Sequence, residues 1–198
     1  MFRSRRTKIA LIFLAVVGFG YVVVRLTQGS GGVPQDFTDA RLQGAIIAQN
    51  IVNLSNQSTN DLEQINALEQ KQDYSNALML TANLVTQSQQ IRDEAVALSA
   101  QVGQMTKALS EISDFSARQA ALESISNRLA LITQLINYSA DLGKLLDVLR
   151  SRFAGTGGTN AEVQALVNQI NTDVNAINNF NSQAGQAMDR FDQIVKGM

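Results

Sequence analysis

Apolar residues recur at alternating intervals of three and four positions over most of the chain beyond residue 36, which is the spacing of one buried stripe on an α-helix. Four segments carry this pattern, at residues 36–70, 74–112, 115–153 and 160–196. Near-equal helices of 35 to 39 residues, joined by short turns, predict an up-down antiparallel four-helix bundle with long coiled-coil-like helices. A dimeric coiled coil is the alternative, because the same spacing suits a seam between two chains.

The third segment shows what this interpretation expects of single residues. Its predicted buried stripe comprises Leu122, Ile125, Leu129, Ile132, Ile136, Ser139, Leu146, Leu149 and Phe153. An aspartate at Leu129 is therefore expected to cost several kcal/mol, because it would place an unpaired charge in the core.

Helix-start chemistry separates the four segments. Asp73, and either Ser113 or Asp114, can accept hydrogen bonds from the free backbone N–H groups of a first helical turn. Residues 159–162 read Thr-Asn-Ala-Glu, a capping box, and they follow a Gly-rich stretch at 155–158. These signals predict turns near residues 71–73, 113 and 154–159.

A different pattern occupies the N-terminus, where residues 9–24 form an uncharged apolar run. With its flanks this run predicts a transmembrane signal anchor at residues 9–27, close to the ~20 apolar residues that a bilayer core requires. Residues 1–8 then form a basic tail, and the Gly-rich residues 28–35 form a flexible linker to a bundle at 36–198. A cleaved signal peptide is the alternative, but Arg25 follows the run directly and no small-x-small site comes after it.

The distribution of charge predicts the topology of this anchor. Arg3, Arg5, Arg6 and Lys8 precede the apolar run, and Arg25 alone follows it closely. By the positive-inside rule the N-terminus is cytoplasmic and the bundle extracytoplasmic, on the plasma (inner) membrane. The chain after Arg25 carries eleven basic and seventeen acidic residues, a formal charge of −6, which disfavours nucleic acid as a partner.

Residues that would support catalysis or metal binding are scarce. The chain has no histidine and no cysteine, so the commonest general base, thiolate chemistry and the usual transition-metal ligands are missing. No calcium-loop or phosphate-loop motif occurs either. We therefore predict no enzyme activity, no cofactor and no metal site.

One speculative site is a polar layer inside the bundle. With the boundaries above, Ser58, Ser88 and Ser139 lie 12 to 15 residues from the distal ends of their helices, and Asn175 offers an amide at a similar height on the fourth. Inward-pointing serines would form a hydrated cavity for a polar ligand. The alternative is that they let helices approach closely while their hydroxyls bond the backbone four residues earlier.

No motif identifies a family, and only the general plan offers a resemblance. One anchor followed by long amphipathic helices resembles LemA-type membrane-anchored bundles and the sensory bundles of chemoreceptors. Chemoreceptor domains return through a second membrane helix, whereas this sequence ends on an amphipathic segment.

Two functions are consistent with these observations. The first is a non-enzymatic interaction or scaffold module of the cell envelope, with the bilayer and either protein partners or a second copy as its contacts. The alternative is a sensor-like bundle that binds a small polar ligand and works through a separate membrane partner. An exposed apolar strip would favour the first function, and a buried polar cavity would favour the second.

Overall fold

The computed structural model describes residues 33–197, and helices account for nearly all of this part of the chain. The elements are α1 (Gln35–Gln70), α2 (Tyr74–Ala108), a short 3-10 helix η3 (Leu109–Glu111), α3 (Phe115–Phe153) and α4 (Asn160–Lys196). The predicted all-α arrangement of four long helices is confirmed for these residues.

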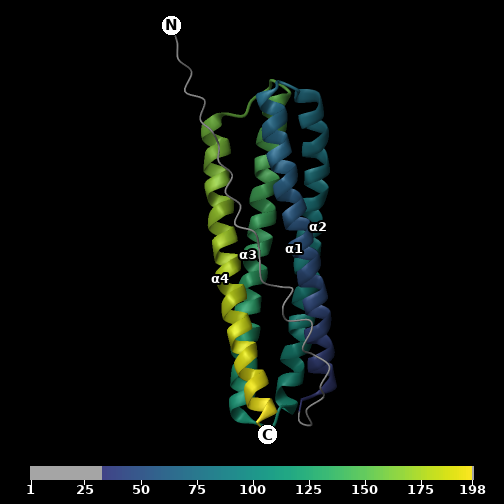
Figure 1. Ribbon diagram of the computed structural model, residues 1–198, viewed down its shortest axis with the longest axis vertical. Helices are drawn as coiled ribbons and strands as arrows, with labels where there is room; N and C mark the ends of the chain where they lie inside the picture. The colour runs from purple at the N-terminus through teal and green to yellow at the C-terminus, as the bar shows by residue number, and fades with distance from the viewer. Residues whose placement is uncertain (1–32, 198) are drawn as a thin grey trace.

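The four long helices lie side by side and run in alternating directions (Figure 1). Each packs against the next in the sequence, α1 on α2, α2 on α3 and α3 on α4. The rings of Phe37 and Phe191, 5.2 Å apart between centroids, join the start of α1 to the end of α4. Arg41 on α1 also binds Asp192 on α4 through two hydrogen bonds of 2.6 and 2.8 Å. The first and last helices therefore meet at the end of the bundle where α1 begins.

The predicted helix starts are confirmed by the caps. Asp73 accepts a hydrogen bond from the Asn76 N–H, and Asp114, rather than Ser113, accepts one from the Ala117 N–H. Thr159 and Glu162 bond each other's backbone N–H groups in a capping box. These bonds satisfy N–H groups that the first turn of a helix leaves without partners.

The turn before α4 depends on Gly158. Its φ of +82° lies in the left-handed region, and a Cβ atom there would stand 2.5 Å from the Val148 carbonyl oxygen. Only glycine fits this position without displacing the backbone.

At the opposite end of the bundle, α2 stops at Ala108, four residues before the predicted limit at 112, and the chain continues as the tighter 3-10 helix η3. A last turn of 3-10 type is common at helix ends, and it brings the chain to the Asp114 cap.

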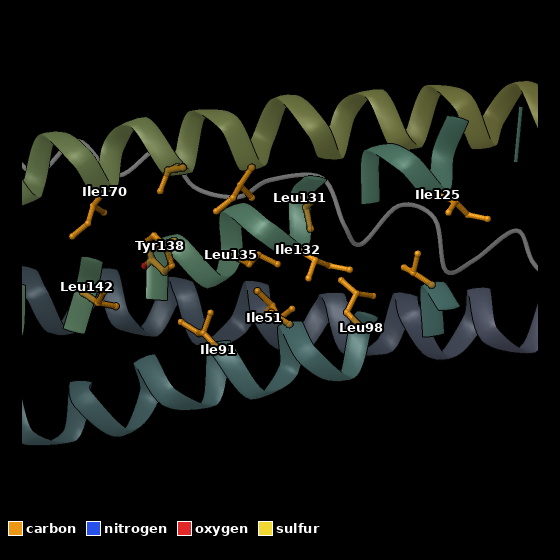
Figure 2. Packing of buried hydrophobic residues seen from close by; sticks show 14 of the residues in the cluster. Ile51, Ile91, Leu98, Ile125, Leu131, Ile132, Leu135, Tyr138, Leu142 and Ile170 are labelled. Carbon is orange, nitrogen blue, oxygen red and sulfur yellow. The ribbon is translucent and has the colours of Figure 1, made fainter. Parts of the chain in front are cut away.

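The core runs the whole length of the bundle. In Figure 2, Ile51, Ile91, Leu98, Leu135 and Leu142 point into the space between the helices. On α2 and α4 the buried residues keep the predicted spacing almost without interruption, from Ala77 to Met105 and from Val163 to Val195. A continuous seam of this kind removes apolar surface from water along the full height of each helix.

The predicted stripe of α3 is wrong at two positions. Leu122 and Leu129 are 53% and 46% exposed, although both keep the apolar spacing. α3 packs on both α2 and α4, and its buried face is centred instead on residues such as Ala121, Leu135 and Leu142. Leu122 and Leu129 lie beyond the edge of that face. The large loss of stability expected for aspartate at Leu129 is therefore wrong, because the side chain is not in the core.

The predicted anchor and the basic residues around it, Arg3, Arg5, Arg6, Lys8 and Arg25, lie outside the described residues. Among the helices of residues 33–197, none is apolar enough over a sufficient length to cross a membrane.

Candidate functional site

Two of the predicted site residues, Ser88 on α2 and Ser139 on α3, form a reciprocal pair. The Ser88 hydroxyl donates to the Ser139 carbonyl oxygen at 2.9 Å, and the Ser139 hydroxyl donates to the Ser88 carbonyl oxygen at 2.8 Å. Both side chains are buried, and their Oγ atoms lie 3.4 Å apart. The hydroxyls therefore bond across the helix interface rather than four residues back along their own helices.

Ser58 on α1 joins a second chain of hydrogen bonds at the same height, which is buried at Ser58 and Gln87 and partly exposed at Asp61. Its hydroxyl donates to Gln87 Oε1 at 3.0 Å, and Gln87 Nε2 donates to Asp61 Oδ2 at 2.7 Å. Gln87 precedes Ser88 directly, so these polar groups of α1, α2 and α3 lie in one layer. Each hydroxyl already has a protein partner, which favours a filled structural layer over a hydrated cavity.

The fourth predicted member of the layer, Asn175, does not take part in it. Asn175 is exposed, whereas Val174 and Ile177 of the same helix are buried. One residue along a helix is a rotation of about 100°, so the neighbour of a core position faces outward.

Replacing Ser58, Ser88 and Ser139 together by alanine tests how much the layer contributes. We expect the free energy of unfolding to change by no more than about 1–2 kcal/mol, because the helix carbonyls keep their backbone partners. Urea denaturation followed by circular dichroism measures it, with the exposed Ser126→Ala as control. A loss of several kcal/mol would contradict the limited role assigned to the layer.

A pair of buried carboxylates between α3 and α4 escaped sequence analysis. Asp141 and Asp173 lie close enough for the charge of Asp141 to act on Asp173, which is only 3% exposed. Lys144 Nζ donates to Asp141 Oδ1 at 2.7 Å, and Gln169 Nε2 donates to Asp173 Oδ1 at 3.3 Å. Asp173 Oδ2 is buried without a hydrogen-bond partner. Burial, and then the charge of Asp141, raise the pKa of Asp173 above its ordinary value of 3.8.

This raised pKa predicts the effect of Asp173→Asn. The folded protein holds the Asp173 proton more tightly than the unfolded chain, so stability falls as the pH rises from about 3.8 through the raised pKa. Asparagine removes the charge and supplies a donor towards Asp141. We expect it to raise the free energy of unfolding at pH 7 by about 1–2 kcal/mol.

Urea denaturation at pH 4, 5, 6 and 7 compares the variant with the unsubstituted protein. The gain should grow with pH and nearly vanish at the acid end. Asp147→Asn, further along α3, is the control. A gain that is the same at every pH would contradict the assignment of the proton to Asp173.

A shallow open groove of about 620 Å³ runs between α1 and α2 on the outside of the bundle. Apolar atoms make up the larger part of its lining surface, and the polar part comes from amide and carboxylate side chains. The lining residues are Asn50, Asn53, Leu54, Gln57, Gln90, Asp93, Glu94 and Ala97. Asn50 Nδ2 donates to Glu94 Oε1 at 3.3 Å across it. The four amide side chains of the groove both donate and accept hydrogen bonds, and its two carboxylates accept them. The lining carries no arrangement of nucleophile and base.

The charged residues of the core could not be recognised from the sequence. Asp173 and Arg128 sit within or beside apolar repeats, where a pattern of apolar positions passes over a single polar interruption. Within residues 33–197 no group of three or more His, Cys, Asp or Glu side chains is placed to hold a metal ion. Comparisons with protein-family models, with curated proteins and with solved structures gave no match for this chain.

Proposed function

We propose that the protein is a single-pass membrane-anchored helical bundle that acts as a non-enzymatic interaction or scaffold module of the cell envelope. The bundle would stand outside the cytoplasm on the anchor at residues 9–27, with either protein partners or a second copy bound to its side. The uncharged run at 9–24 and the basic residues before it support the anchor and its orientation.

The observation that carries the interaction role is a strip of exposed apolar side chains on α3. Leu122 and Leu129 are separated by seven residues, or about two helical turns, and so lie on the same side of the helix. Ile136, a further seven residues on, is partly buried and extends the strip. Leu122 and Leu129 keep a core-like spacing although they are exposed, which is typical of a surface that another helix covers.

A neighbouring residue on α2 widens this strip. The Ser88–Ser139 pair sets the two helices at one height. Val96 lies eight residues from Ser88 and Leu129 ten from Ser139, in the same direction along the bundle, so their heights differ by about 3 Å. Val96 is 57% exposed. An apolar surface spread over two helices suits a protein partner better than it suits a small polar ligand.

The proposal is tested by a charge substitution in the strip. Full-length tagged protein is crosslinked in native membranes, purified and examined by mass spectrometry for co-purifying chains, including a second copy with a different tag. We expect specific partners to be lost in Leu122→Lys/Leu129→Lys. They should be retained in Asn168→Lys/Asn175→Lys, a matched change at two exposed positions seven residues apart on α4.

The same cells report topology through an enzyme fused after Met198 that is active only outside the cytoplasm. Activity of this fusion is the expected result. Identical sets of co-purifying proteins for both double variants would contradict the interaction strip, and a C-terminus reachable only from the cytoplasm would contradict the orientation.

A further inference from the structure

Arg128 occupies a position on α3 that the helical repeat assigns to the core. The residues one turn to either side, Ser124 and Leu131–Ile132, are buried. In Figure 2, Leu131 and Ile132 point into the interior of the bundle. Arg128 itself is partly buried, and its Nε atom is fully shielded from water. A charged group here costs free energy unless something pairs with it.

Within residues 33–197, Arg128 has no ion pair, and its Nε has no hydrogen-bond partner. A second cation, Arg41 on α1, is 7% exposed and lies close enough for its charge to act on Arg128. Arg41 uses its two Nη atoms on Asp192, and its Nε is also buried without a partner. Two guanidinium groups and one carboxylate therefore share this region, and one positive charge is left without a counter-ion.

This excess charge is present at neutral pH. Burial, and then the charge of Arg41, lower the pKa of Arg128 to about 10, which still leaves the guanidinium protonated at pH 7. A guanidinium presents its N–H donors in a planar fork that matches two oxygens of a carboxylate, phosphate or sulfate. The buried residues of α1 and α4 in this part of the bundle include small ones, Ala45 and Ala48 on α1 and Ala184 on α4.

We propose that Arg128, with Arg41 nearby, binds a small oxyanion at the edge of the bundle interior, in the half of the bundle where α1 begins and α4 ends. The ligand is a group with at least two oxygens, of the carboxylate or phosphate class, that accepts hydrogen bonds from Arg128 and balances its charge. Asp192 keeps Arg41 in place and makes the site selective for one added negative group. This inference is independent of the proposed interaction role, which concerns the outer side of α3.

The test is the thermal unfolding of full-length protein in a mild non-ionic detergent, in sodium phosphate, sodium acetate or sodium chloride at matched ionic strength. A ligand that binds only the folded state raises Tm in a saturable way, and we expect a rise of several degrees at millimolar phosphate or acetate over chloride. Comparing phosphate with acetate distinguishes the two oxyanion classes. Isothermal titration calorimetry with phosphate gives the stoichiometry, expected to be one per chain.

Three substitutions decide whether Arg128 is responsible. Arg128→Gln should abolish the specific rise, and Arg128→Lys should weaken it at least tenfold in affinity, because it keeps the charge but loses the fork. Arg150→Gln, an exposed arginine further along α3, should leave it unchanged. If Arg128→Gln responds to phosphate as the unsubstituted protein does, or if no oxyanion acts beyond chloride, the proposal is overturned.

Discussion

Aspartate in place of Leu142 should unfold the bundle at room temperature or bring it close to unfolding. Leu142 lies in the second half of α3 and is fully buried, and Figure 2 shows it among the core side chains. A carboxylate there would lie in hydrocarbon with no partner, at a cost of about 4 kcal/mol or more. Urea denaturation of full-length protein in detergent, followed by circular dichroism, measures the loss.

The matched control is the same substitution at Leu129 on the same helix. Leu129 is nearly half exposed, so an aspartate there keeps its hydration and should cost less than about 1 kcal/mol. Equal losses at both positions would mean that the buried face of α3 has been assigned wrongly. The pair therefore tests the correction that the structure makes to the apolar pattern.

Removing the negative charge of Asp192 should have the second-largest effect. Asp192→Asn would leave Arg41, almost wholly buried, without its carboxylate and next to the charge of Arg128. Loss of one partner of a buried ion pair costs about 3–5 kcal/mol, and the partial exposure of Asp192 reduces this to about 2–3 kcal/mol. The same denaturation experiment applies.

Two further variants separate the cause from a general effect of charge. Asp189→Asn, an exposed change on the same helix, should cost less than about 0.5 kcal/mol. Arg41→Met combined with Asp192→Asn should recover much of the loss, because it removes the cation that was left unpaired. A double variant no more stable than Asp192→Asn would show that the loss does not come from the isolated charge of Arg41.

The fold could be predicted from two local features of the sequence, the apolar seams and the helix caps, and both are present in the structure. The seam of α2 and α4 is buried at almost every expected position, and the caps at Asp73, Asp114 and Thr159 act where the sequence places them. These features depend only on residues within one or two turns. The buried face of α3 depends on its two partner helices, and several apolar repeats compete on that helix, so Leu122 and Leu129 were assigned to the core although they lie outside it.

The candidate site was accessible to sequence reasoning only in part. Ser88 and Ser139 interrupt apolar seams at matching distances from helix ends, which places them at one height, and the structure brings them together. Asn175 matched in height but not in direction around its helix. Asp173 and Arg128 gave no signal, because the environment of a charge in the core is set by residues from other helices, more than 25 positions away in the sequence.

The paired serines also determine how α2 and α3 are aligned along their length. A repeat of seven residues allows one helix to slide past another by two turns while apolar side chains still meet apolar side chains. Such a slide would set Ser88 against Ile132 or Leu146, both buried, and would break the reciprocal pair of hydrogen bonds. A hydroxyl left without another acceptor in hydrocarbon costs about 1–3 kcal/mol. Hydrophobic packing alone would leave several alignments of α2 along α3 nearly equal in energy, and the two serine hydroxyls select one of them.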